Sequence, residues 1–171
     1  MNNNRLKKKL FPLLVIPFLL VGCSKEQKEY VLNESTFFLV MTNIQYYPED
    51  YVGKNITFDC FTYELLTIEN ETYLCGVRKC ASGFGCKCGK DTIIGFIMEK
   101  DIGLPEPKNQ YENTNDKAWI HVTGQLETDE KTTFKIFGAD NSEEEVQFLS
   151  FKVESFSLIE DYSNLHYYVE K

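Results

Sequence analysis

From Asn55 onwards, apolar and polar residues alternate over several short stretches of the chain. In Asn55–Tyr63, Ile56 and Phe58 fall on one side of an extended backbone, and the polar residues between them fall on the other. A period of two is typical of a strand with one buried face. The pattern predicts strands over Asn55–Tyr63, Thr72–Val77, Trp119–Leu126, Thr133–Phe137 and Val146–Ile159, the last as one strand or two. Thr92–Met98 is apolar on both faces, which predicts a central strand.

The segments between these strands carry turn and loop residues. Thr128–Lys131 predicts a turn, and the acidic run Glu143–Glu145 predicts a solvated loop. Lys100–Lys117 is long for a connection and contains two prolines. It fits either a plain surface loop or a loop that binds a partner.

Two further elements precede the first of these strands. Thr36–Ile44 is apolar without a clear period, so it fits a strand or a buried helix. Pro48–Gly53 predicts a single helical turn, because proline opens it, acidic residues follow and glycine closes it. Five or six short strands with a small helical element indicate a mainly β fold, a small barrel rather than a sandwich.

The first 22 residues have the composition of a secretory signal peptide. Residues 1–9 carry four basic side chains and no acid, and an apolar run follows over residues 10–21. This run is shorter than the roughly 20 residues that a membrane-spanning helix needs. Pro12 and Pro17 would also disturb such a helix.

The end of this segment, Leu20-Val21-Gly22-Cys23, resembles the bacterial lipoprotein box. The resemblance implies that Cys23 is the lipidation site, where the thiol receives a diacylglyceryl group and the new N-terminus an acyl chain such as palmitate. Residues 23–34 would then be a lipidated, flexible tether at the extracytoplasmic face of a bacterial membrane. The alternative is an ordinary buried or disulfide-bonded Cys23.

The charge balance limits the partners of the chain. Its 171 residues have a net charge of −8, and removal of residues 1–22 would leave −12, because that segment holds four positive charges and no negative one. Nucleic acid is excluded as a partner, since phosphate affinity needs lysine and arginine. An acidic body is also repelled by anionic lipid, so membrane attachment would depend on the acyl chains at Cys23.

Two motifs and the cysteine-rich segment between them carry a resemblance to a known family. Tyr51–Phe58 (Tyr-Val-Gly-Lys-Asn-Ile-Thr-Phe), the cysteine-rich segment after it and Trp119–Gly124 (Trp-Ile-His-Val-Thr-Gly) resemble the soluble C-terminal domain of YcgQ-type permease subunits and related lipoproteins. The resemblance implies an OB-like β-barrel domain over residues 35–160, with residues 161–171 as a tail. Only the domain carries over from this resemblance; as partner we expect a membrane protein or permease.

The cysteines are the main chemical feature of the sequence. Beside Cys23, Cys60 stands alone, and the other four form a C-x4-C-x5-C-x-C array of Cys75, Cys80, Cys86 and Cys88. In an exported chain these four fit disulfides. Next after disulfides, the four suit a tetrahedral zinc site. A thiol redox centre and free thiols in an anaerobe are the remaining alternatives.

Cys60, the two histidines and the basic residues around the array complete the candidates for cysteine or metal chemistry. Cys60 shares a face with apolar neighbours and fits a buried small hydrophobe. His121 fits a hydrogen-bonded surface residue or a fifth metal ligand, and His166 in the tail is a weaker candidate ligand. Arg78 and nearby lysines would offset the negative charge of thiolates.

The sequence contains no motif of an established enzyme class, such as G-x-S-x-G, a P-loop or HExxH. We therefore expect a membrane-anchored, non-enzymatic binding module that acts through its cysteine-rich loop and the 100–117 loop. The alternatives are a zinc-binding lipoprotein that serves a transporter and a thiol redox enzyme.

Overall fold

The fold is described from a computed structural model that covers residues 29–67, 71–80, 92–137 and 143–169. Residues 1–28, which include Cys23, lie outside the described residues, as do Cys86 and Cys88. The described part of the chain is mainly β, with one short α-helix and two 3-10 turns.

Seven strands and three helical segments follow one another along the described part of the chain. The strands are β1 (Tyr30–Leu32), β2 (Asn55–Leu66), β3 (Thr72–Cys80), β4 (Thr92–Met98), β5 (Trp119–Phe137), β6 (Glu143–Leu158) and β7 (Tyr168–Val169). The helical segments are α1 (Phe37–Tyr46), η1 (Pro48–Asp50) and η2 (Lys100–Ile102).

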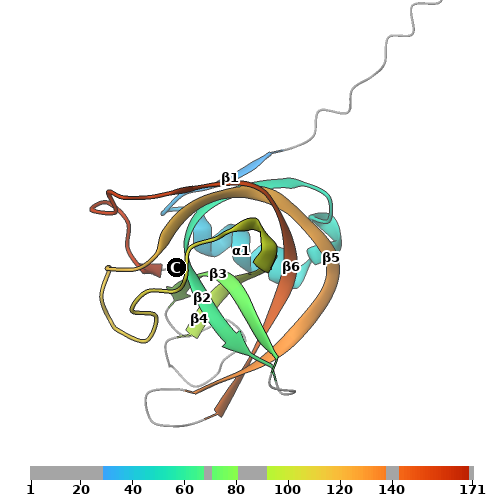
Figure 1. The fold of residues 1–171 in the computed structure, drawn as a ribbon. Helices are drawn as coiled ribbons and strands as arrows, with labels where there is room; N and C mark the ends of the chain where they lie inside the picture. The colour runs from blue at the N-terminus through green and yellow to red at the C-terminus, as the bar shows by residue number, and fades with distance from the viewer. Residues whose placement is uncertain (1–28, 68–70, 81–91, 138–142, 170–171) are drawn as a thin grey trace, which may run out of the picture.

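The five longer strands form a partial ring in the order β2–β5–β6–β4–β3, which returns to β2 (Figure 1). β2 makes this return possible because it pairs with β5 over Asn55–Phe61 and with β3 over Phe61–Leu66. β4 and β6 run parallel and share only three residue pairs, so the ring is partly open there. This order confirms the expected OB-like, mainly β fold.

Apolar side chains fill both faces of the sheet. One cluster, which includes Phe58, Phe96 and Phe151, also contains the buried face of α1. The second cluster, which includes Phe61, Trp119 and Phe134, lies on the opposite face. β4 is buried along its whole length because it contributes to both clusters, as its apolar sequence predicts.

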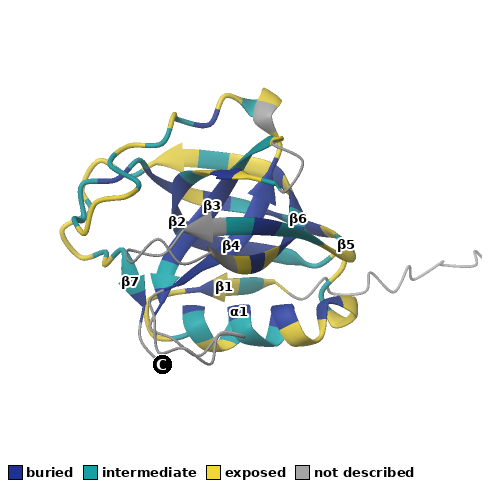
Figure 2. Cartoon of the chain, turned by 90° about the horizontal axis from the view of Figure 1, so that it is seen from below, coloured by how far each residue is buried: buried dark blue, intermediate teal, exposed yellow. Residues whose placement is uncertain are grey.

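The segment before η1 is a helix rather than a strand. Phe37, Met41 and Ile44 recur at helical spacing and are buried in the first cluster. α1 lies across one end of the ring, below the strands in Figure 2. The predicted helical turn is confirmed as η1, with Pro48 at its first position.

Three sequence predictions of local structure are wrong. Thr128–Lys131 is not a turn between two strands, because β5 runs on to Phe137. Glu143–Glu145 is not a loop but the start of β6, where pairing with Lys135–Phe137 supplies the backbone hydrogen bonds of a ladder. The described residues form seven strands and not five or six, because the sequence pattern did not reveal β1 and β7, which are only three and two residues long.

Candidate functional site

The structure does not bring Cys75 and Cys80 together. They are five residues apart on β3, so their side chains leave opposite faces of the strand. Cys75 belongs to the second apolar cluster and Cys80 to the first. Cys86 and Cys88 lie outside the described residues, in which no three histidine, cysteine or acidic side chains converge as metal ligands.

Cys60 is a buried thiol, as predicted, with no measurable exposure in the first cluster. Cys60 and Cys75 are both free cysteines among the described residues. Burial raises the pKa of each thiol far above its ordinary value, because a thiolate would lose its hydration. Neither has the lowered pKa of a catalytic thiol.

His121 is a hydrogen-bonded surface residue, which confirms the plainer of its two interpretations. Its Nδ1 lies 2.6 Å from Oδ1 of Asp59, directly across the β2–β5 ladder. Ser157 faces His121 on β6, but no hydrogen bond joins these two residues in the described structure. Aspartate, histidine and serine therefore lie in one row without the contact that would activate the serine.

Arg78 has a structural position that the sequence did not reveal. Its side chain is 1% exposed, and its Nη2 donates to both carboxylate oxygens of Glu34 at 2.7 and 2.8 Å and to the backbone oxygen of His166. The guanidinium lies 5.0 Å from the ring centre of Trp119. Arg78 thus connects β3 with the segments at both ends of the described chain.

The long connection between β4 and β5 is fixed to the C-terminal tail. Asn115 accepts a hydrogen bond from the backbone N–H of Tyr167 at 2.9 Å and donates to the backbone oxygen of Tyr162 at 3.1 Å. Lys117 is buried at 3% exposure and donates to the backbone oxygen of Glu112 at 2.6 Å, and burial lowers its pKa. Beside these contacts, Tyr111 remains 80% exposed.

A pocket of about 510 Å³ opens between β3, the end of β4 and the middle of the β5–β6 pair. Its apolar lining consists of Tyr73, Ile97, Met98 and Phe151, three of which belong to the two clusters. Its polar lining consists of Glu71, Thr72, Glu99, Glu127 and Ser150. We call this cavity the acidic pocket, because the charged side chains among its described lining residues are all carboxylates.

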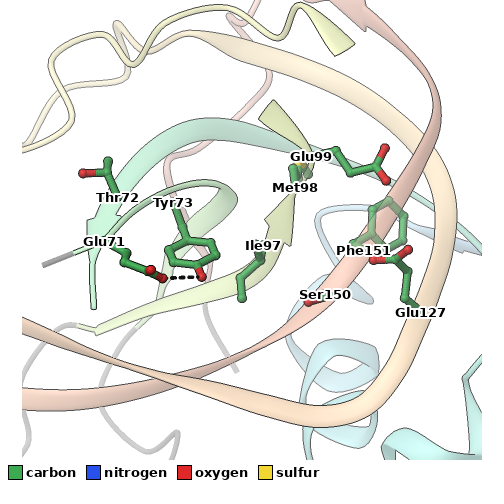
Figure 3. A pocket seen from close by; sticks show the side chains of 9 residues that line it. All are labelled: Glu71, Thr72, Tyr73, Ile97, Met98, Glu99, Glu127, Ser150 and Phe151. Atoms are coloured by element: carbon green, nitrogen blue, oxygen red, sulfur yellow. Dashed lines mark hydrogen bonds between the residues drawn. The ribbon is translucent and has the colours of Figure 1, made fainter. Parts of the chain in front are cut away.

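The two ends of the acidic pocket carry the carboxylates. Figure 3 shows Glu71 and Tyr73 at one end, Glu99 and Glu127 at the other, and Ile97 between them. The Tyr73 hydroxyl donates to Oε2 of Glu71 at 3.0 Å, which orients that carboxylate. All three glutamates are exposed, so a ligand in solution can reach them.

An irregularity in the ladder positions Glu127 at this pocket. Leu126 pairs with Phe151 and Lys131 with Leu149, so the four β5 residues between them face Ser150 alone. The strand therefore bulges outward at residues 127–130, and bulges commonly adjoin binding sites. The turn-favouring residues Thr128–Lys131 therefore form part of a bulge within a continuous strand, and not a turn between two strands.

The sequence did not identify the pocket glutamates. Glu71, Glu99 and Glu127 lie in three separate segments, and only the ring brings them to one cavity. The pocket lies on β3 and β4, the second and third strands of the ring along the chain. In OB folds this face and the loop before it bind ligands.

The fold and the pocket define a small, OB-like β domain with a ligand-sized cavity. The chain belongs to the family described as the DUF1980 C-terminal domain, whose model matches residues 20–144. This membership agrees with the resemblance to the YcgQ-type domain. No curated protein and no solved structure matches the chain. Within the described residues, no helix is long and apolar enough to cross a membrane.

Proposed function

We propose that the protein is a membrane-anchored, extracytoplasmic binding module that takes a small ligand in the acidic pocket without transforming it. The observation that carries this proposal is the pocket itself: a cavity of about 510 Å³ whose lining combines apolar side chains with exposed carboxylates. That combination is typical of small-molecule sites. Its place on β3 and β4 is the usual binding face of OB folds, which supports the proposal by analogy.

The anchor in this proposal comes from the sequence. The basic start, the apolar run and Leu20-Val21-Gly22-Cys23 support lipidation at Cys23. Six residues separate Cys23 from β1, so the distance from Cys23 to Tyr30 is about 25 Å at most when the chain is extended. The ring would then stay close to the lipid surface, beside a membrane-protein partner. The exposed Tyr111 of the long connection is a suitable contact for such a partner.

The pocket can be tested through the methyl group of Met98. Met98 lines the acidic pocket, whereas Met41 is buried on α1, so the two residues provide a reporter and an internal reference for methyl NMR. We expect a mixture of small amines, polyols and carboxylates to shift the Met98 signal in a saturable way and to leave the Met41 signal unchanged.

A blocked pocket supplies the control. Ser150→Trp places a large ring at the pocket lining, and Ser157→Trp places the same ring at an exposed position of the same strand. The shift of Met98 should disappear in the first variant and persist in the second. A mixture that leaves Met98 unchanged in the unmodified protein would overturn the proposed function.

A further inference from the structure

We propose that α1 rests on the lipid surface to which Cys23 would attach the chain, and that this contact holds the domain in one orientation. The contact is made by the outer face of α1, which consists of the exposed side chains of Leu39, Tyr46 and, directly after the helix, Tyr47. The inference rests on the anchor of the proposed function, because it names the surface of the domain that meets the lipid.

The outer face of α1 presents large apolar side chains at helical spacing. Leu39 is 65% exposed, Tyr46 64% and Tyr47 58%. Residues seven and eight positions apart return to the same side of a helix, whereas Phe37 and Met41 point the other way and are buried in the first cluster. Figure 2 shows α1 at one edge of the molecule, with the labelled strands on its inner side. The strands therefore leave the outer face in contact with solvent.

α1 carries no charged side chain. Its sequence is Phe-Phe-Leu-Val-Met-Thr-Asn-Ile-Gln-Tyr, in a chain of which 26% of the residues are charged. A helix that faces water normally has charged residues on its outer side. An uncharged face with one leucine and two tyrosines instead suits the boundary between lipid headgroups and acyl chains, where tyrosine rings are enriched.

The attraction between this face and lipid is apolar and not electrostatic. Glu49 and Asp50 are exposed on η1, just beyond Tyr47. Lys131 offsets part of this charge, since its ammonium group donates to the backbone oxygen of Gln45 in the last turn of α1 at 2.5 Å. The outer face therefore needs no anionic lipid, and we expect it to dock on zwitterionic phosphatidylcholine.

The start of the described chain lies next to the end of α1 that carries the two tyrosines. Tyr30 in β1 pairs with Ile56 near the start of β2, and its ring centre lies 5.1 Å from that of Tyr51, which directly follows η1. The six residues between Cys23 and Tyr30 allow a reach of about 25 Å. α1 is roughly 15 Å long, so a membrane that holds Cys23 can meet the whole outer face.

Other exposed apolar side chains lie farther from the tether. A domain of this size has a radius of gyration of about 14 Å and is therefore roughly 35 Å across. Leu66 is ten residues beyond Ile56 on β2, which corresponds to roughly 33 Å along an extended strand. The ring of Tyr111 lies 6.0 Å from that of Tyr63, also in the second half of β2. Leu66 and Tyr111 therefore serve as controls for the outer face.

The tether makes a small face sufficient. Three side chains would bind lipid only weakly from free solution, but attachment at Cys23 makes the contact intramolecular and raises the effective concentration of lipid. The contact then orients the domain, while the acyl chains hold it at the membrane. The end of the ring that α1 covers faces the lipid, and the opposite end faces away from it.

The test places a tryptophan on the outer face of the lipidated chain. Tyr47→Trp reports on this face, and Tyr111→Trp reports on an exposed tyrosine of the long connection. Each lipidated protein is reconstituted in phosphatidylcholine vesicles with and without brominated phosphatidylcholine, whose bromine atoms quench nearby tryptophan. We expect quenching in the Tyr47→Trp variant only, because Trp119 is 2% exposed and gives the same background in both proteins.

A matched pair of substitutions tests the face in the Tyr47→Trp background. Leu39→Glu adds a charge to the outer face, and Leu66→Glu adds the same charge at the far end of β2; the two leucines are 65% and 54% exposed. The first should move the equilibrium between docked and undocked domain at least about tenfold toward the undocked state, and the second should leave it unchanged. Higher salt should leave the quenching in place, because the face is uncharged. Unchanged thermal unfolding of both variants shows that the fold is intact.

Every outcome decides between the alternatives. Equal quenching of the Tyr47→Trp and Tyr111→Trp variants, or equal effects of the two glutamate substitutions, overturns the outer face as the lipid contact. If quenching is absent and the emission of the Tyr47→Trp variant moves to shorter wavelength as its density in plain vesicles rises, a second copy covers the face and the inference is wrong.

Failure of the outer face is distinguishable from failure of the proposed function. A chain that sediments with vesicles but shows no quenching refutes the outer face alone. A wild-type chain without an acyl group that does not sediment with vesicles refutes the anchor and the outer face together. The Met98 measurement of the acidic pocket is independent of both results.

Discussion

Arg78 is a buried charge whose partner is only partly buried. The arginine side chain is 1% exposed, whereas Glu34 keeps 38% of its side chain in contact with water. Removing one member of such a pair has unequal consequences. Without Glu34 the remaining charge of Arg78 is buried, whereas without Arg78 the remaining charge of Glu34 is hydrated at the surface. The Nε of Arg78 has no hydrogen-bond partner among the described residues. Loss of a further partner would therefore leave more of this buried group unsatisfied.

We therefore predict that Glu34→Ala destabilises the protein more than Arg78→Met does. Loss of Glu34 leaves a buried guanidinium without its carboxylate, a change that costs about 3–5 kcal/mol. Loss of Arg78 leaves a hydrated carboxylate and removes a donor from the backbone oxygens of Asp59 and His166, which costs roughly 1–3 kcal/mol. Urea denaturation measured by circular dichroism gives both free energies of unfolding.

Glu49→Ala is the matched control, because Glu49 is exposed on η1 and its removal should change the free energy of unfolding by less than about 0.5 kcal/mol. The opposite order, with Arg78→Met the more damaging change, would show that the arginine acts mainly through its contacts with Trp119 and the backbone and not through the ion pair.

Among the elements, β5 shows what the pattern of apolar, polar and turn-favouring residues can predict and what it cannot. Period-two alternation placed β2 and β3 within a few residues, and the continuous apolar run Thr92–Met98 matches β4 at both ends. The same reasoning divided β5 at Thr128–Lys131, because those residues favour turns. It could not foresee that β6 pairs on both sides of this segment, which keeps the strand continuous around a bulge.

The bulge yields a second prediction. A regular ladder would place one residue opposite Ser150, so the bulge contains three more residues than pairing requires. Deleting Thr128, Asp129 and Glu130 joins Glu127 to Lys131 and preserves both flanking pairs and their faces. Because these three side chains are outside both apolar clusters, we expect the deletion to change stability by less than about 1 kcal/mol.

Thermal unfolding and the methyl NMR signals test this expectation. The deletion should retain a cooperative transition and the Met41 signal, but it should move the Met98 signal, because Glu127 and the pocket lining shift. Replacing the same three residues by alanine keeps the bulge and should leave both signals in place. Loss of cooperative unfolding on deletion would mean that β5 needs the bulge in order to bend.

The candidate site was less predictable than the fold for a physical reason. Turns and strands depend on neighbouring residues, so the local sequence contains most of the necessary information. The acidic pocket depends on Glu71, Glu99 and Glu127, which are separated by 28 residues each and meet only when the ring forms. The opposite holds for Cys75 and Cys80, which are close in sequence but face different clusters.

For the molecule as a whole, the net charge determines how it can be attached to a membrane. A mature chain at −12 would be repelled by anionic lipid, so the surface of the protein gives little help in holding it at a membrane. Attachment would depend on acyl chains, each buried methylene group contributing about 0.8 kcal/mol. The proposed location therefore depends on one residue, Cys23.

We predict that a palmitate analogue labels the protein in a bacterial host and that Cys23→Ala abolishes the label. Cys60→Ala is the control, because Cys60 is a buried thiol of the ring and should not be acylated. In-gel detection of the analogue, with membrane fractionation of the same cells, measures both attachment and location. Labelling that survives Cys23→Ala, or an unlabelled wild-type protein, would contradict lipid anchoring.

The contacts of Arg78 also have a consequence for protein engineering. One guanidinium binds both the side chain of Glu34 and the backbone of His166, so the first and last parts of the folded domain meet at a single group. A short peptide bridge could join these parts, and the chain could be opened at another surface site to give a circular permutant. Conversely, a reporter fused to the C-terminus would emerge close to the tether and could obstruct it.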